Sequence, residues 1–502
     1  MSSKLSLFMR GSTFRVLQTL VSIGIGFAMM PFLIGELGKE LYGLWVVVGS
    51  VVGTYYLLDM GFSQAVTRFV TKYIHQERYE DANKIINTAL VIYSVLGAFV
   101  LLVSVGFAFL GAESLLEDKS QVSLVQILLI VGGLQLALEF PAKAFPGVIG
   151  SYMRFDWIAK VRTAKTIVDA LLIYIFISNG YGLITMAVIG FVTGCISTAI
   201  YVAIVNKLFS QLKYGRRYVD LMTLKGIYSF SKWVFLLDLS VMLRGKIDIW
   251  LIAFFQGNSI LTVYYVAVRL VDYAISLLSQ ATNMTTPIFT EYYAKEQWPE
   301  LRRSLRDFIK LDFYFALLAM SGFYLLGATF INLWMGDAFP VEQSWSCLVV
   351  LVVGRMASYI SLPLQCLLFT FNRHRDNAIL AVLETAVVLC LGLLLIPEYG
   401  ILGAAFSVAI PTFIGRLVIL PVISNRVFQF LDSKFLFQLL ASLCAIGAIT
   451  YGYKFSGLLV GRGLVDLLLG ATIVVITSVT TLVFLITREN VTILRRWVRD
   501  RK

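Results

Sequence analysis

Charged residues are scarce in this sequence of 502 residues, where Asp, Glu, Lys and Arg together make up only 14%. Soluble domains carry about 25% charged residues, so this chain has too little charge to cover the surface of a soluble protein of its length. Apolar residues reach 58%, and mostly apolar tracts of about 18 residues or more, each able to cross ~30 Å of hydrocarbon, recur throughout. The composition predicts a polytopic membrane protein and excludes disordered chains, secreted disulfide scaffolds and cytosolic enzymes.

Residues that usually carry metal or nucleotide chemistry are also few. The five cysteines show no CxxC spacing and lie in apolar stretches, and the two histidines lie in charged loops. This pattern predicts buried cysteines and no metal site. The sequence has no G-x-x-x-x-G-K-[ST], HExxH or G-x-S-x-G segment. We therefore expect a protein that is not an enzyme, with no catalytic residues and no nucleotide hydrolysis of its own.

The apolar tracts, separated by charged or Gly/Pro breaks, predict about fourteen transmembrane helices. Their approximate spans are 12–37, 42–68, 84–110, 122–146, 158–178, 183–206, 226–256, 262–290, 308–334, 343–371, 377–396, 400–424, 434–453 and 464–487. The first tract is too long for a cleaved signal peptide, lacks an A-x-A-like site and is followed closely by a second span. We therefore expect it to remain in the membrane.

Lys and Arg are distributed unevenly between the two sets of loops. Loops on the amino-terminal side, together with the tail from Arg488, carry 30 of them, whereas the opposite loops carry 4: Lys39, Lys119, Lys454 and Arg462. Because Lys and Arg are enriched on the cytoplasmic side, both termini are predicted to be cytoplasmic. This bias explains most of the net charge of +12 without a nucleic-acid partner.

Several features recur about 220 residues apart in the two halves of the chain. They are Gly35 and Tyr42 with Gly257 and Tyr264, Pro141 with Pro363, Asp156 with Asp376, and YGLITMA with YGILGAA. Six helices per copy give both copies the same orientation, so we predict two six-helix lobes in a parallel pseudo-twofold repeat, with a cavity between them. The predicted parts are an N-lobe (1–210), a cytoplasmic linker (211–225), a C-lobe (226–425), and two extra helices with a basic tail (426–502).

Ionisable residues within the predicted spans are candidates for function, because ionised groups are costly in hydrocarbon and usually face a bundle interior or a watery cavity. They are Asp59, Glu139, Lys143, Lys165, Asp169, Lys232, Asp238, Arg244, Lys246, Asp248, Arg269, Asp272, Arg355, Glu384 and Arg416. Four pairs lie about one helical turn apart and can neutralise each other: Glu139 with Lys143, Lys165 with Asp169, Arg244 with Asp248, and Arg269 with Asp272.

Four of the cations, Arg244, Lys246, Arg269 and Arg355, fall at similar predicted depths in three helices of the C-lobe. This placement predicts a cationic pocket for an anionic substrate; structural pairing is the alternative explanation. Asp59 is the only acid in the predicted span 42–68. It is a candidate charge partner or coupling-cation ligand, with a packing role as the alternative.

Three amino-terminal segments carry a family resemblance: the helix end Pro31–Ile34, the G-x-x-x-Y-G-x-W turn Gly38–Trp45, and the LDxGxxxAxTR segment Leu58–Arg68. With the helix count and the repeat, they resemble the polysaccharide transporter family of the multidrug/oligosaccharidyl-lipid/polysaccharide (MOP) exporter superfamily. Its members include O-antigen and exopolysaccharide repeat-unit flippases. The resemblance implies outward flipping of undecaprenyl-pyrophosphate-linked oligosaccharides across the bacterial inner membrane by alternating access. It also implies that the first, second, seventh and eighth helices line the cavity, although the first has no cation at mid-membrane.

The resulting site prediction assigns Arg244, Lys246, Arg269 and Arg355 to substrate binding and Asp59, Asp248 and Asp272 to a coupling ion or to charge pairing. No cofactor is expected except a coupling cation, H⁺ or Na⁺. The expected partners are the lipid-linked oligosaccharide, membrane lipids, a polysaccharide polymerase and a chain-length regulator. A cation-coupled multidrug exporter is the first alternative, disfavoured because an acidic cavity would be expected. A membrane glycosyltransferase or polymerase is the second, disfavoured by short outer loops without clustered carboxylates.

Overall fold

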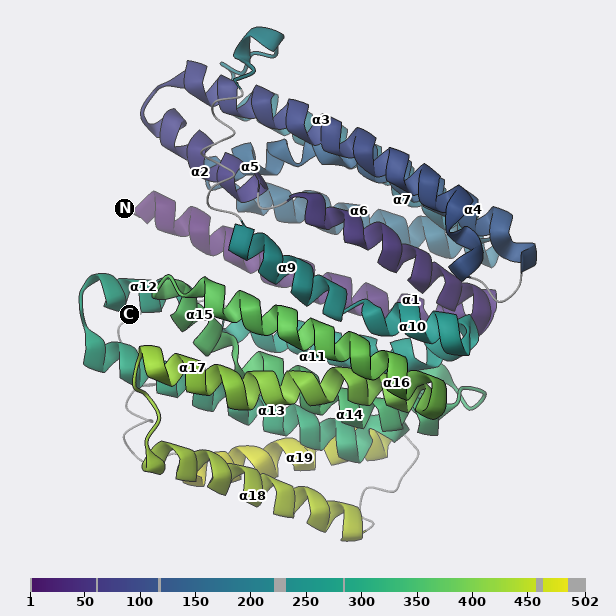
Figure 1. Ribbon diagram of the computed structural model, residues 1–502, viewed down its shortest axis with the longest axis vertical. Helices are drawn as coiled ribbons and strands as arrows, with labels where there is room; N and C mark the ends of the chain where they lie inside the picture. The colour runs from purple at the N-terminus through teal and green to yellow at the C-terminus, as the bar shows by residue number, and fades with distance from the viewer. Residues whose placement is uncertain are drawn as a thin grey trace. The chain divides into compact units, whose positions relative to one another are not determined.

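The computed structural model describes residues 2–59, 62–115, 119–220, 232–282, 285–456 and 464–485. Within these ranges the chain consists of helices and short turns, with no β-strand (Figure 1). This confirms the predicted all-α membrane class. Nine segments of the described chain are long and apolar enough to span a membrane, so the figure of fourteen spans stays a prediction.

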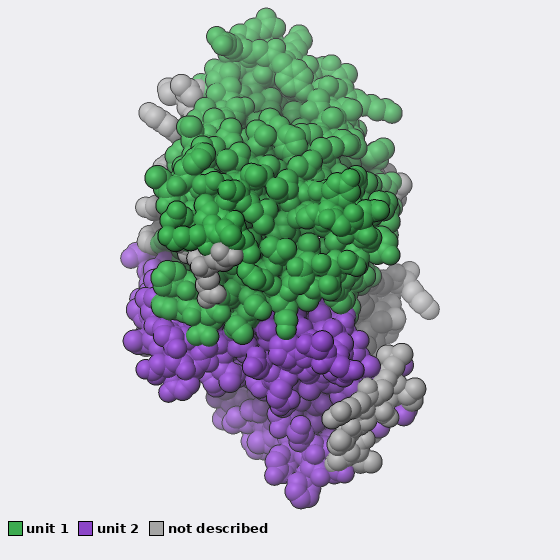
Figure 2. All heavy atoms as spheres, turned by 90° about the vertical axis from the view of Figure 1, so that its right-hand side faces the viewer, with its two compact units in different colours: residues 1–262 green, residues 263–502 purple. Residues whose placement is uncertain are grey.

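The chain divides into two compact units, residues 1–262 and 263–502 (Figure 2). The helices of the first unit are α1 (Ser2–Thr54), η1 (Tyr55–Asp59), α2 (Phe62–His75), α3 (Tyr79–Leu110), η2 (Ala112–Leu115), η3 (Lys119–Gln121), α4 (Val122–Ala142), α5 (Ala144–Ser151), α6 (Phe155–Ser178), α7 (Leu183–Leu208), η4 (Arg216–Tyr218), α9 (Lys232–Arg244) and α10 (Ile247–Gln256).

The second unit starts within α11 (Asn258–Thr282). Its other helices are α12 (Thr285–Ala294), α13 (Trp298–Met335), α14 (Val341–Ile360), α15 (Leu362–Thr370), α16 (His374–Ile414), the π-helical turn η5 (Gly415–Ile419), α17 (Leu420–Val427), α18 (Ser433–Ser456) and α19 (Leu464–Leu485). The last two, which sequence periodicity placed outside the repeat, pack against α13.

Close helix pairs hold each unit together. In the first unit α3 packs along α4, and α1 packs along α6 (Figure 1). In the second unit α14 packs on α13 and on α16. Glycine permits two of these approaches, because a β-carbon at Gly97 would meet the Ala137 carbonyl oxygen and one at Gly354 would meet the backbone of Ala409. The apolar core of the first unit, around Phe140, is formed mainly by α2, α3, α4, α5 and α7, and that of the second, around Leu367, mainly by α12, α13, α15 and the segment from α17 to α18.

Backbone conformation recurs between the halves more regularly than sequence does. Positive φ angles occur at Gly38 and Gly257, at Glu77 and Glu296, and at Met153 and Asn372, three pairs each separated by 219 residues. A fourth pair, Gly180 and Gly400, is separated by 220. Gly38 (φ 79°, ψ 164°) and Gly257 (φ 81°, ψ 167°) have nearly the same conformation. The turn glycine of the first copy is therefore Gly38, which corrects the sequence match of Gly257 to Gly35 and supports the repeat.

Candidate functional site

The predicted helix 226–256 is interrupted where two of the candidate cations lie. Residues 221–231 lie outside the described residues; α9 ends at Arg244 and α10 begins at Ile247, with Gly245 and Lys246 between them. Gly has a low helix propensity, and here it sits at the break. The expectation of one continuous helix was wrong, and the interruption brings two half-buried cations to a single turn.

Two candidate acids lie in the same unit as this break. Asp248, in the first turn of α10, is 1% exposed, and its Oδ1 accepts a hydrogen bond of 2.9 Å from the Ile249 N–H. Asp59 ends η1 and accepts a hydrogen bond from the hydroxyl of the fully buried Tyr93 on α3. Because α9 packs against η1, Asp59 belongs to an element that neighbours the cation-bearing segment.

A second polar cluster of the first unit surrounds Glu139 on α4. The Tyr56 hydroxyl donates to Glu139 Oε2 at 3.3 Å, and Gln135 Nε2 donates to Oε1 at 3.0 Å. Lys143 Nζ lies over the Tyr56 ring at 4.6 Å from its centre and over the Phe140 ring at 4.2 Å. Sequence spacing suggested Lys143 as the partner of Glu139. The Gln135 contact is also an i,i+4 pair on α4, which was not predicted, whereas the Tyr56 contact depends on how η1 meets α4.

The pair predicted between Lys165 and Asp169 on α6 is confirmed. Lys165 Nζ lies 2.7 Å from Asp169 Oδ2, with both side chains about a quarter exposed. Thr193 on α7 donates to Asp169 Oδ1 at 2.5 Å, so the acid has a hydrogen-bond partner on each side. Because each carboxylate oxygen of Asp169 has a partner within the protein, a structural role is favoured for this cluster.

In the second unit the structure brings three candidate residues together on α11 and α14. Arg355 Nη1 donates to Asp272 Oδ1 at 2.8 Å, with the side chains 21% and 36% exposed. The Arg269 guanidinium lies 4.9 Å from the centre of the Tyr265 ring, one turn earlier on α11. The pairing of Asp272 with Arg355 joins two helices and was not predicted, because sequence spacing identifies only partners on the same helix.

The seven predicted site residues therefore fall into two groups. One contains Asp59, Arg244, Lys246 and Asp248 in the first unit, and the other contains Arg269, Asp272 and Arg355 in the second. Each group mixes cations and acids within helices that are otherwise apolar. A single pocket formed by all four cations stays a prediction.

Among the described residues, the most deeply buried ion pair lies elsewhere in the second unit. Arg416, on the π-helical turn η5, is 1% exposed; its Nη2 lies 2.7 Å from Oε2 of Glu384 on α16, which is 3% exposed. Arg416 Nη1 also donates to Asn377 Oδ1 at 2.8 Å. The sequence predicted that both charged residues lie within the membrane but did not predict that they form a pair. Since both groups are enclosed, we assign the pair to packing of α16 against η5.

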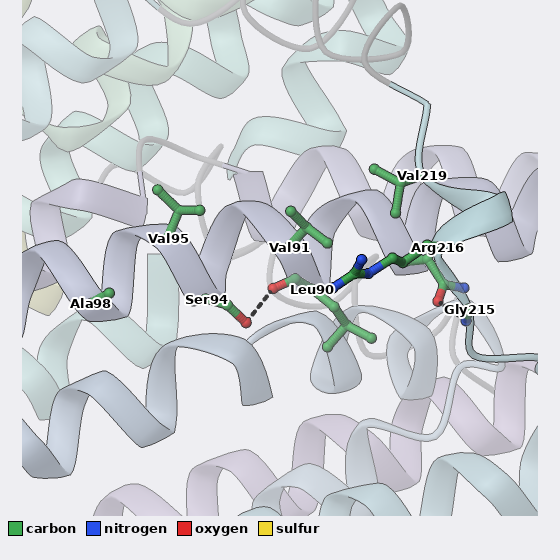
Figure 3. A pocket seen from close by; sticks show the side chains of 9 residues that line it. Leu90, Val91, Ser94, Val95, Ala98, Gly215, Arg216 and Val219 are labelled. Carbon is green, nitrogen blue, oxygen red and sulfur yellow. Dashed lines mark hydrogen bonds between the residues drawn. The ribbon is translucent and has the colours of Figure 1, made fainter.

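An open groove of about 480 Å³ lies on α3, beside the turn at 215–219 (Figure 3). Its walls are mainly apolar and include Leu90, Val91, Val95 and Val219, with Arg216 at one end. The segment bearing Arg216 is held on α3 by side chains such as Asn87, whose Nδ2 donates to the Lys213 carbonyl at 2.8 Å. None of the predicted site residues lines this groove.

Comparison with known proteins agrees with the predicted resemblance. A family model described as "polysaccharide biosynthesis protein" matches residues 8–293. An uncharacterized membrane protein of Bacillus subtilis, EpsK, is 20% identical over 430 residues, covering 85% of this chain and 85% of that protein. A Shigella flexneri protein named for O-antigen transport is 20% identical over 401 residues, covering 79% and 92%.

Two solved structures share the fold. The lipid II flippase MurJ, in an inward closed conformation, superposes with a TM-score of 0.74 at 14% identity, covering 93% of this chain and 97% of that chain. An inward-facing multidrug resistance MATE transporter of the MOP superfamily gives 0.69 at 15% identity, covering 82% and 94%. These matches show that the chain shares the multi-pass membrane fold of these two transporters.

Proposed function

We propose that this chain, which belongs to the polysaccharide biosynthesis protein family, is a flippase for an undecaprenyl-pyrophosphate-linked oligosaccharide. It moves an O-antigen or exopolysaccharide repeat unit from the cytoplasmic to the outer leaflet of a bacterial inner membrane. The sugars and the pyrophosphate pass through the protein while the polyprenyl tail stays in lipid. A polysaccharide polymerase and a chain-length regulator act on the same product.

The observation that carries this proposal is the set of half-buried cations on apolar helices, Arg244, Lys246, Arg269 and Arg355. A pyrophosphate that enters hydrocarbon without partners faces a prohibitive desolvation cost. Arginine offsets that cost well because its planar guanidinium binds phosphate oxygens in a two-pronged geometry. The Arg355–Asp272 pair is partly exposed, so an incoming anion can compete with the carboxylate for the guanidinium.

Transport follows alternating access, and we propose that it is coupled to H⁺ or Na⁺. The acids Asp59, Asp248 and Asp272 are the predicted partners of the cations or of the coupling ion. The break between α9 and α10 supports a moving element here, because interrupted helices allow segments of a transporter to rotate about a binding site.

Reconstituted vesicles test the substrate. Purified protein should speed the appearance of a short lipid-linked pyrophosphate oligosaccharide on the opposite leaflet, measured by its accessibility to an added sugar-oxidising reagent. Vesicles with the Arg269→Ala variant serve as the matched control. Efflux of a cationic dye without movement of the lipid-linked sugar would instead identify a multidrug exporter, the function named for the MATE structure with the related fold.

Membrane orientation gives an independent prediction. Single cysteines, placed in a background lacking the five native ones, should react readily with an impermeant reagent from outside at Asn179 and Glu398, and slowly at Asn258, which is only 8% exposed. Cysteines at Arg216, Arg303 and Lys502 should react only after the membrane is opened, because the Lys/Arg bias places those loops and both termini in the cytoplasm. External labelling at Lys502 would disprove the fourteen-helix topology.

A further inference from the structure

A buried carboxylate in the second unit lacks the partners that the other buried acids have. Asp312, on α13, is 0% exposed. Neither of its carboxylate oxygens accepts a hydrogen bond of ordinary geometry, although the Tyr359 hydroxyl is close enough to act on the carboxyl group. Among the described residues no Lys, Arg or His forms an ion pair with it. Glu384 is similarly buried, at 3% exposed, but has the Arg416 guanidinium at 2.7 Å. The two acids therefore differ mainly in that Glu384 has a cationic partner and Asp312 has none among the described residues.

The surroundings of Asp312 are polar but neutral. The Tyr359 hydroxyl of α14 acts on the carboxyl group but is directed to the Leu278 carbonyl oxygen of α11, at 3.4 Å. The Cys366 thiol of α15 also interacts electrostatically with Asp312, and it accepts a hydrogen bond of 3.1 Å from the Thr286 hydroxyl of α12. These groups are neutral: the Tyr359 hydroxyl can donate a hydrogen bond to the carboxylate, but none of them is a cation that would neutralise its charge.

Charged groups near Asp312 in sequence serve other contacts. Lys310 on the same helix places its Nζ 5.7 Å from the centre of the Phe435 ring, and residues two apart on a helix do not face each other. The contact of α18 with α13 includes Ser321 and Thr450, whose hydroxyls are 2.7 Å apart. An ionised carboxylate in this enclosure would bear a large desolvation cost with no cation to offset it.

We propose that Asp312 is a proton-binding site of the transport cycle, a proposal that rests on the function proposed above. In the conformation seen here Asp312 is the neutral carboxylic acid. A helix break adjoins it: α14, which bears Tyr359, ends at Ile360, and α15, which bears Cys366, begins at Leu362. When these segments separate and admit water, the carboxyl O–H bond breaks and the proton passes to water, leaving the carboxylate. Closure requires the proton to return, which couples the cycle to the proton gradient.

Infrared difference spectroscopy of the full chain in lipid nanodiscs tests the site directly. Acid-minus-alkaline spectra should contain a carbonyl stretch of a buried, protonated carboxyl group, and Asp312→Asn should remove it. Asp169→Asn, the matched control, should leave that band unchanged, because the Asp169 carboxylate lies 2.7 Å from Lys165 and is partly exposed. Asp312→Asn should also accumulate to the normal level, since its amide has the shape and neutrality of the acid. A wild-type band that persists in Asp312→Asn, or failure of this variant to fold, would overturn the proposal.

Transport measurements separate this inference from the proposed function. In vesicles with an imposed pH gradient, wild-type movement of the lipid-linked oligosaccharide should accelerate, whereas Asp312→Asn should give the same rate with and without the gradient. Gradient-dependent acceleration retained in Asp312→Asn would refute coupling through this residue. If the wild type moves no lipid-linked sugar, the proposed function is wrong. The infrared band would still show whether Asp312 is protonated.

Discussion

Replacing Arg269 by alanine is expected to abolish glycan export while leaving the amount of protein in the membrane near normal. Arg269 lies half-buried on α11, over the ring of Tyr265, and the Asp272 carboxylate already has Arg355 at 2.8 Å. Removing Arg269 therefore takes away positive charge without removing the ion-pair partner of that acid. Complementation of an export-deficient strain, measured beside membrane abundance, gives the result.

Related variants sharpen this test. Arg244→Ala and Lys246→Ala should also lose export, and Arg269→Lys should recover only part of it, because an ammonium cannot reproduce the two-pronged guanidinium contact with a pyrophosphate. Asp59→Asn should impair export as well. Lys165→Ala is the control, since Lys165 is a similarly placed cation committed to Asp169, and it should export normally. Full export by the alanine variants at 244, 246 and 269, at normal abundance, would end the cationic-site hypothesis.

Local sequence patterns were sufficient for features that depend on one helix at a time. Apolar tracts predicted the helical membrane class, and i,i+4 spacing predicted the Lys165–Asp169 pair, because both follow from helix geometry. The break after Arg244 was missed because the tracts on both sides of RGKID are mostly apolar, and hydropathy averaged over a long window does not register a single glycine. The match of Gly35 to Gly257 was wrong because it compared residue identity alone. What recurs between the two halves is backbone conformation, which Gly38 and Gly257 share.

Contacts between different helices could not be predicted from the sequence. Arg355 and Asp272 are 83 residues apart, and Arg416 and Glu384 are 32 apart; only the register of packed helices brings them together. Asp312 was not among the predicted intramembrane charges. The apolar tract 308–334 was expected to begin at residue 308, so Asp312 resembled a residue near a helix end. In the structure α13 already begins at Trp298, and Asp312 is buried within the helix bundle. The one available signal was an acid beside a predicted helix end with no basic residue one turn later.

Loss of Arg416 should have the largest effect on stability. The ion pair of Arg416 with Glu384 is nearly inaccessible to solvent, at 1% and 3% exposed, and Asn377 accepts a further bond from the guanidinium. Breaking a buried pair by removing one partner leaves an uncompensated charge and costs about 3–5 kcal/mol. Arg416→Ala should therefore lower both membrane abundance and the thermal unfolding midpoint of the purified protein. Lys165→Ala, which disrupts a partly exposed pair, should lower them much less.

Two further variants distinguish loss of the pair from loss of side-chain volume. Arg416→Met combined with Glu384→Leu should recover most of the abundance, because well-packed apolar residues often replace a buried ion pair without loss of stability. Gly415→Ala keeps both charges but places a β-carbon against the Glu384 carboxylate, so it should destabilise the protein although no charge is removed. If Arg416→Ala accumulated normally with an unchanged thermal unfolding midpoint, the ion pair would not be structural. The export activity of this variant would then show whether the Arg416 charge serves transport.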